Sequence, residues 1–418
     1  MKESLWSLFS AGIFLFVMIF NHFKQLEKFQ GENENPKFHG YKGRINIRQA
    51  PVNPTNVSEK FVSAIVDATG VDKILDYNDP TTPIGAFTQW QLYQKPYGQR
   101  EGSSTAFLSP DILTPDGLGE NERKLRVFYY STVLRILFEG RRAVGVELLK
   151  EGKMLKVYAR KKVIISAGIN SPQLLMFSGI GPVRELQQAG IPIVFNNPNV
   201  GKNVTNHTLN TAIFSMNQRD MADLQGDPFA LYTGGAFLPH PFSRMNGRRS
   251  VQLIGTVSEG NLIIVVIFLQ PRSRGTIRIQ NNDPLKIVLA DEGFLDNPFD
   301  METIKAIFRM YIKPMAMKLS TIDSAYQLLN PTIDTIDNDE ALEEYIKENF
   351  GHNHHQQGFL RMAPFSRGGV VDNQGRVHGV DHLIVADASI IPFSVDGNTS
   401  AAAYLIGYTV AKNLMQEE

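Results

Sequence analysis

Apolar residues near the C-terminal end of the chain form short runs, and a polar residue follows each run directly. Leu383–Ala386 is apolar throughout, which is typical of a strand that is covered on both faces. Asp387 follows it, at the position where an open α/β sheet binds its ligands. A helical pattern runs from Ser400 to Met415, and Asn398 and Thr399 before it are residue types that cap helices. The N-terminus of this helix would direct N–H groups toward Asp387, which predicts a polar or anionic ligand there.

A second strand–turn–helix pattern lies in the middle of the chain. Val163–Ile165 is a short apolar run and predicts another buried strand. Ala167 and Gly168 form the predicted turn, Ser171 is the predicted cap of the next helix and Pro172 its first residue. The unit is of the nucleotide-binding type, although its turn is short and contains one glycine.

The remaining pattern predicts further strands, further helices and one long irregular segment. Strand-like runs are Val127–Tyr130, Val133–Phe138, Val144–Leu149, Met154–Tyr158, Asn261–Leu269 and Thr276–Ile279. Helix-like runs are Val57–Thr69, Met301–Lys318 with an interruption at Pro314, and Asp339–Phe350. Residues 206–260 show no clear period, and we expect them to be irregular. The predicted fold class is α/β, with α+β character overall.

Composition excludes several kinds of protein. The chain has 418 residues, of which 43% are hydrophobic and 20% charged, as in a globular protein of two or three domains. Its formal net charge is zero, so we expect no nucleic-acid partner. It contains no cysteine, which excludes disulfides, thiolate metal sites and cysteine nucleophiles.

The chain starts with an apolar run, Leu5–Phe20, that is shorter than the roughly 20 residues needed to span a bilayer. Lys2 precedes it, but no small-residue cleavage site follows. It is equally compatible with a signal peptide, a membrane anchor or a stray hydrophobic helix. The first two alternatives allow a secretory, membrane or virion-associated location, and the sequence does not decide between them.

Four ordered blocks resemble the GMC (glucose–methanol–choline) flavin oxidoreductases. The C-terminal block is His-x-x-Gly from His355, Gly-Val-Val-Asp from Gly369, Val-Ala-Asp-Ala-Ser from Val385 and Gly-Asn-Thr from Gly397. The other three are Ser166–Pro182, Val200–His207 and Leu269–Gly275. The stretch Gln89–Leu108 is most similar to GMC homologues of giant viruses.

The resemblance implies an FAD cofactor, hydride transfer from an alcohol or sugar hydroxyl group, and a set of site residues. His355 matches the family's proton acceptor, a role that suits an imidazole because its unperturbed pKa lies near neutrality, and Asn398 matches the second catalytic position. Its implied cofactor-binding residues are Ala167, Gly168, Asp387, Ala388 and Thr399. Phe359 and Leu360 stand where the family usually has small residues, so we expect an altered pocket.

The site residues also have simpler interpretations, and a metal site is not expected. His355 could be an inherited histidine with no flavin opposite it, and Asn398 could be only a helix cap. Strand-end packing alone could explain Ala167, Gly168, Asp387 and Ala388. His352, His354 and His355 are close in sequence, but no carboxylate lies at ligand spacing, so we expect no metal site.

The glycine-rich part of an FAD site has no counterpart in the sequence. Neither Gly117-Leu118-Gly119 nor Gly179-Ile180-Gly181 is followed by a third glycine or preceded directly by a strand. The segment that begins near Phe38-His39-Gly40 resembles one that lies well inside the sequences of family members, but here it lies close to the start of the chain. Losing three or four hydrogen bonds to the pyrophosphate and ribose, at roughly 1.5–3 kcal/mol each, would weaken FAD binding severely.

We therefore expect an N-terminally truncated, inactive homologue with an incomplete FAD-binding Rossmann-like domain and a substrate domain with an antiparallel sheet. One alternative is half of a split enzyme, completed by a chain that carries the glycine-rich region. Another is a non-catalytic structural or virion protein. The expected division is 1–22 hydrophobic start, 23–120 part of the substrate domain, 121–205 remnant of the FAD-binding domain, 206–349 substrate domain and 350–418 C-terminal part of the FAD-binding domain.

Overall fold

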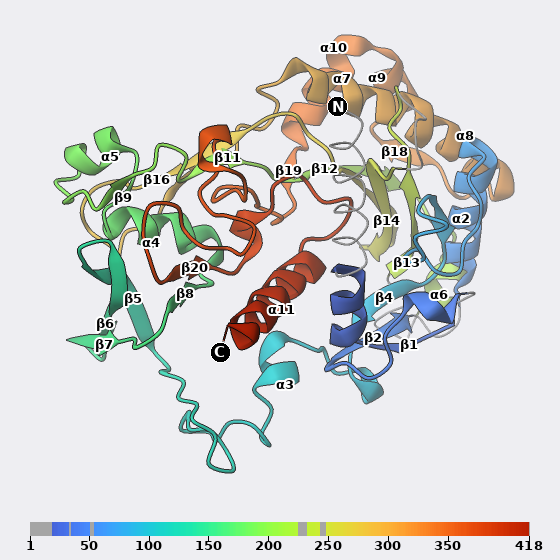
Figure 1. Ribbon diagram of the computed structural model, residues 1–418. Coiled ribbons are helices and arrows are strands. Elements are labelled where there is room, and N and C mark those ends of the chain that lie inside the picture. Colours follow the sequence, from blue (N-terminus) through green and yellow to red (C-terminus); the bar gives the residue numbers. More distant parts are fainter. Residues whose placement is uncertain (1–18, 33–34, 51–53, 225–231, 243–247, 418) are drawn as a thin grey trace, which may run out of the picture.

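A seven-stranded antiparallel sheet forms one side of the molecule in the computed structural model (Figure 1). The structure describes residues 19–32, 35–50, 54–224, 232–242 and 248–417. The strand order is β18 (Leu328–Asn330), β12 (Thr208–Phe214), β15 (Asn261–Phe268), β14 (Val251–Ser258), β13 (Tyr232–Leu238) and β3 (Gly85–Phe87), and β19 (Gly351–His352) also pairs with β12.

Helices cover one face of this sheet, and their apolar sides form the largest core (Figure 1). They are α2 (Asn56–Thr69), α7 (Pro298–Ile307), α8 (Lys313–Ile322), α9 (Ile333–Asp337) and α10 (Asp339–Glu348), with the short α6 (Gln218–Asp223) beside α2. Phe61, Phe214 and Phe308 are fully buried between these helices and the sheet. Their burial removes large apolar surfaces from water.

The other side of the molecule contains smaller sheets. β5 (Ser131–Glu139), β6 (Arg142–Lys150) and β7 (Lys153–Tyr158) form an antiparallel sheet, and β8 (Val163–Ile165) pairs in parallel with β20 (Leu383–Val385). The remaining elements are β9 (Ile180–Gly181) with β10 (Phe195–Asn196), β11 (Lys202–Val204) with β16 (Gly275–Arg278) and β17 (Leu289–Asp291), and the helices α3 (Ser103–Phe107), α4 (Ser171–Phe177) and α5 (Val183–Gln188).

The C-terminal helix α11 (Ser400–Gln416) lies between the two sides (Figure 1). Val410 packs with Ile384 and Ala386 of the β20 segment. Tyr404 and Tyr408 pack against a small core beside β1 (Glu27–Gln30), β2 (Ile45–Ala50) and β4 (Trp90–Tyr93). This helix therefore connects the strand that precedes it with the N-terminal part of the described chain, where residues 19–26 are helical.

Two of the predicted secondary-structure assignments are wrong. Residues 127–130 form a loop in which the Tyr130 side chain is 94% exposed. The supposedly irregular residues 206–260 contain β12, β13 and β14. The alternation in β12 is hidden because Thr208 and Asn210 are polar residues at buried positions. The Asn210 amide nitrogen donates to the backbone oxygen of Ile346 at 3.1 Å.

Two further predictions are corrected in detail. Ser171 is the first residue of α4 rather than its cap, which is Asn170. Val163–Ile165 is a strand, but it is not buried throughout, because Ile164 is 48% exposed. The predicted interruption at Pro314 is a π-helical segment, Phe308–Ile312, which lengthens the turn directly before the proline and so accommodates its missing N–H.

No helix in the described residues is long and apolar enough to cross a membrane. Most of the apolar run Leu5–Phe20, residues 5–18, lies outside the described part of the chain.

Candidate active site

Backbone pairing holds the segment that carries His355 in place. β19 pairs with the start of β12, and two backbone hydrogen bonds of 3.0 and 2.9 Å join Thr205 and Gln357. The backbone N–H of His355 donates to Asn206 Oδ1 at 2.9 Å. His355 therefore lies between two paired positions, which restricts its backbone.

Two side chains from distant parts of the sequence contact the His355 ring. Its Nε2 lies 3.2 Å from Asn398 Nδ2, and its Nδ1 lies 2.9 Å from His207 Nδ1. The two imidazole rings meet edge to face with centroids 5.0 Å apart. The structure thus brings together His355 and Asn398, which the sequence singled out. It adds His207, whose position within a family-like block was noticed without a role.

Both imidazoles are neutral near pH 7. Burial lowers the pKa of His355 to about 4, with a smaller contribution from the charge of His354. Burial also lowers the pKa of His207 to about 3, followed by repulsion from His355. The pKa of His355 therefore lies below the unperturbed value of an imidazole, which is near neutrality. At neutral pH its ring has one unprotonated nitrogen, which is what a proton acceptor requires.

Asn398 is part of this cluster and not a helix cap. Gln252 Nε2, on β14, donates to Asn398 Oδ1 at 3.3 Å, and Asn398 Nδ2 faces His355. The cap position of α11 is Thr399, whose side chain makes no capping hydrogen bond. The first turn of α11 therefore begins next to Asn398 with backbone N–H groups that no cap side chain satisfies, a favourable environment for a partial negative charge.

Ala167, Gly168, Asp387 and Ala388 come together where β8 and β20 end. Asp387 Oδ2 accepts from the Gly168 backbone N–H at 3.0 Å and from Ser171 Oγ at 2.5 Å. Its Oδ1 accepts from the Ser389 backbone N–H at 2.8 Å. The carboxylate is therefore used to join the two strand ends, as the packing interpretation expects.

Phe359 and Leu360 do not obstruct the His355 cluster. Their side chains are 1% and 0% exposed, and they belong to the core that contains Val371, Leu383 and Ile390. The expectation that these bulky residues alter the pocket is not supported by where their side chains lie.

The cluster fits the reactive end of a flavin better than its nucleotide end. The neutral ring of His355, the exposed amide of Asn398 and the first turn of α11, which no side chain caps, lie together. A Cβ atom added to Gly168 or Gly397 would have no neighbour within 4 Å, so both turns border open space. In the described residues, however, no strand leads into a glycine-rich turn of the type that binds a pyrophosphate.

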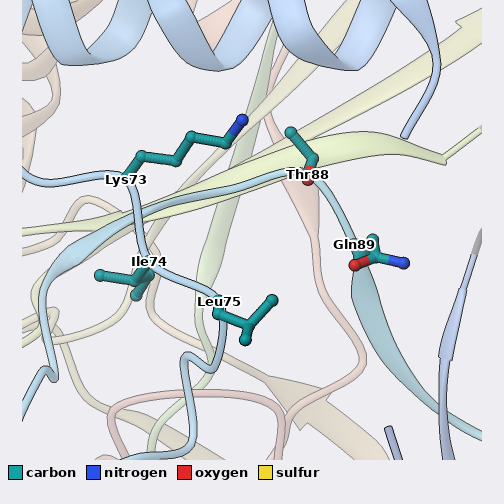
Figure 2. Close-up of a pocket in the computed structure, with 5 residues that line it drawn as sticks. All are labelled: Lys73, Ile74, Leu75, Thr88 and Gln89. Carbon is teal, nitrogen blue, oxygen red and sulfur yellow. The ribbon is translucent and has the colours of Figure 1, made fainter. Parts of the chain in front are cut away.

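Two other features do not belong to this site. Figure 2 shows a pocket lined by Lys73, Ile74, Leu75, Thr88 and Gln89, none of which is in the His355 cluster. Within the described ranges, no group of three or more His, Cys, Asp or Glu residues could hold a metal ion.

Comparison with known proteins identifies the family. Two family profiles, both described as GMC oxidoreductase, match residues 21–209 and 271–407. An oxygen-dependent choline dehydrogenase of Sinorhizobium fredii is 25% identical over 99% of this chain and 77% of its own length. An uncharacterized GMC-type oxidoreductase of Mycobacterium tuberculosis is 30% identical over 75% of this chain and 62% of its own length.

Solved structures show the same fold. A pyridoxine 4-oxidase from Mesorbium loti has a TM-score of 0.82 at 22% identity, covering 96% of this chain and 77% of that one. A fungal aryl-alcohol oxidase has a TM-score of 0.83 at 20% identity, covering 96% and 79%. The two family profiles together span most of the sequence, on either side of residues 210–270, the segment that contains Gln252. The chain therefore belongs to the GMC oxidoreductase family, whose cofactor is FAD.

Proposed function

We propose that this chain provides the acid–base site for oxidation of an alcohol or sugar CH–OH group, with FAD as the hydride acceptor. The observation that carries the proposal is the contact of neutral His355 with Asn398, at 3.2 Å between Nε2 and Nδ2. His355 Nε2 would take the hydroxyl proton, and the Asn398 amide would donate to the oxygen as negative charge develops on it. Bound FAD would supply the electron acceptor.

The names of the relatives agree with this class of substrate. Choline dehydrogenase and aryl-alcohol oxidase are both named for alcohol substrates. The contact between His355 and Asn398 gives no reason to expect a defective acid–base site, so inactivity of the chain alone would come from weak FAD binding. The similarity of Gln89–Leu108 to giant-virus proteins stays a prediction.

We further propose that firm FAD binding requires a complementary chain that carries a glycine-rich strand–turn–helix unit, and that residues 1–418 alone are inactive. Two surfaces support this. Ile164 on β8 is 48% exposed, although it lies in a parallel sheet, and β8 pairs with no strand other than β20 in the described residues. Of the seventeen residues of the apolar α11, Val410 is fully buried and residues 401–409 are only half-buried. Interior strands and helices of a parallel sheet are normally covered.

The proposal is tested by titrating the purified chain with FAD, alone and with a separately expressed glycine-rich domain. We expect the chain alone to bind FAD weakly, and the mixture to bind one FAD for each copy of the chain. Anaerobic addition of primary and secondary alcohols to the mixture should then bleach the flavin absorbance. A mixture that binds FAD but is bleached by no alcohol or sugar would contradict the proposed reaction. Tight FAD binding by the chain alone would contradict only the need for a partner.

A further inference from the structure

We propose that His207 is a positioning residue that selects the tautomer of His355, so that the unprotonated nitrogen of His355 is Nε2, the one facing Asn398. The catalytic meaning of this inference rests on the proposed function, but the tautomer itself does not. His207 is completely buried between β11 and β12, and it contacts the side of the His355 ring that faces away from Asn398.

The backbone carbonyl of Val395 determines where His207 carries its proton. His207 Nε2 lies 3.0 Å from this oxygen, which can only accept a hydrogen bond. Ser394 Oγ is also within 3.2 Å of Nε2, but its hydroxyl donates to the Leu269 oxygen at 2.7 Å. Neutral His207 is therefore protonated on Nε2, and its Nδ1 can only accept.

The tautomer of His355 follows from that of His207. Because His207 Nδ1 can only accept, the 2.9 Å contact is a hydrogen bond only if His355 Nδ1 donates. A neutral imidazole then has its lone pair on Nε2, where Asn398 Nδ2 can donate at 3.2 Å. Gln252 Nε2 donates in turn to Asn398 Oδ1. In the series Gln252, Asn398, His355, His207 and Val395, each contact therefore pairs one donor with one acceptor.

One neighbour must adapt to this arrangement. The Nδ2 atom of Asn353 lies 3.2 Å from His355 Nδ1, so two donors would face each other. A rotation of the Asn353 amide by half a turn presents its oxygen instead and removes the conflict, since the two ends of the amide have nearly the same shape. The backbone carbonyl of Val395 has no such freedom, so it decides the direction.

A merely structural His207 would pack in the core without controlling proton positions. The two roles differ in what a substitution does to the His355 ring. His207→Leu removes the acceptor and the donor, whereas His207→Gln keeps one acceptor and one donor at the end of a planar amide. We expect His207→Leu to release the His355 tautomer and His207→Gln to preserve it.

The test is two-dimensional NMR of deuterated protein with ¹⁵N-labelled histidine, without cofactor and near neutral pH. Signals of His355 and His207 are assigned from their loss in His355→Gln and His207→Gln. We expect His355 protonated on Nδ1 and His207 on Nε2 in the wild type, and a mixed or reversed His355 tautomer in His207→Leu. His355 protonated on Nε2 in the wild type would overturn the inference, even if no variant folds, and so would an unchanged tautomer in folded His207→Leu.

Turnover provides a second, separate readout. In an FAD-loaded assembly, His207→Leu should lower kcat on the order of 10²-fold, the lower end of general-base effects, with a smaller change in KM. His207→Gln should recover most of that loss. If the tautomers are as expected but no alcohol is oxidised, the proposed function fails while the assignment of His207 stands.

Discussion

Asp387 at the end of β20 accepts a hydrogen bond from the backbone N–H of Gly168 after β8, at 3.0 Å. The same carboxylate also accepts from Ser171 Oγ and from the Ser389 backbone N–H. Three donors converge on one side chain that is only 8% exposed. The acidic residue that follows the buried strand therefore fixes the relative positions of two turns.

Replacing Asp387 tests this structural role. In Asp387→Asn an amide NH₂ group must face at least one of the three donors, which leaves a buried donor without an acceptor. We expect the free energy of unfolding, measured by urea denaturation, to fall by about 1–3 kcal/mol. Asp381→Asn, an exposed carboxylate just before the same strand, should change it by less than about 0.5 kcal/mol. Equal effects of the two substitutions would contradict the assigned role.

His39 links three segments near the start of the described chain. Its Nδ1 lies 3.0 Å from Glu27 Oε1, its Nε2 lies 2.6 Å from Asp76 Oδ2, and its ring stacks on Phe29 with centroids 3.8 Å apart. Burial alone would lower the pKa of His39, but hydrogen bonds and charge from Asp76 and Glu27 outweigh it and raise the pKa to about 9.

Because the pKa of His39 is raised, the free energy of unfolding should fall as the pH becomes alkaline. The unfolded pKa of histidine is about 6.5, so the contribution of His39 is complete below that value and is lost as pH rises through 9. We expect the free energy of unfolding to fall by roughly 1–3 kcal/mol over this range. His39→Gln should remove most of that dependence, whereas His382→Gln, at an exposed position, should retain it. A wild-type stability that is flat from pH 6.5 to 9 would show that His39 is not charged.

Sequence patterns predict the strands and the helix that carry the site, but they do not predict which residues far apart in the sequence contact one another. β8, β20 and α11 were predictable because short apolar runs and a helical period are local signals. β12 was missed because buried Thr208 and Asn210 break the expected alternation. The Asn210 amide nitrogen on this strand donates to Ile346, a partner far along the chain that no local pattern can show.

The candidate site follows the same division. His355 and Asn398 were identified from family-like motifs, but the role of His207 depends on a contact across 148 positions of sequence. The position of Asp387 directly after a buried strand predicted a ligand beside it, and the structure shows three hydrogen-bond donors to its carboxylate from the protein itself. Motifs therefore indicated which residues come together in the site, and the role of each residue follows only from the directions of its hydrogen bonds.

The buried histidines His207 and His355 should lower the free energy of unfolding as the pH becomes acidic, whereas His39 lowers it as the pH becomes alkaline. The pKa of His207 is lowered to about 3 and that of His355 to about 4. The unfolded chain therefore binds protons first, and stability should fall as pH drops from 6.5 toward 4. We expect a loss of roughly 1–3 kcal/mol from His207 alone. His207→Gln should reduce the acid sensitivity without changing the alkaline limb, as followed by thermal unfolding across pH.

Substitution of His355 separates proton transfer from cofactor binding. His355→Gln cannot accept a proton, so in an FAD-loaded assembly the anaerobic bleaching rate with an alcohol should fall by about 10²–10⁴-fold. FAD affinity should change little. His352→Gln replaces an exposed imidazole in the same segment and should leave the rate within about twofold of wild type. A His355→Gln protein that is bleached at the wild-type rate would rule out His355 as the base.

The exposed face of β8 tests the need for a complementary chain. Ile164 is 48% exposed in the middle of a strand whose neighbours Val163 and Ile165 are buried. Ile164→Lys should change the unfolding free energy of the isolated chain by less than about 0.5 kcal/mol, because the side chain already contacts water. If a glycine-rich domain covers this face, a buried lysine would be strongly unfavourable there. We therefore expect Ile164→Lys to weaken assembly by at least about tenfold in sedimentation or titration calorimetry. Met154→Lys changes an exposed apolar residue on β7 and should assemble like the wild type. Unimpaired assembly of Ile164→Lys would show that any partner binds elsewhere, and the open face of β8 would then need another explanation.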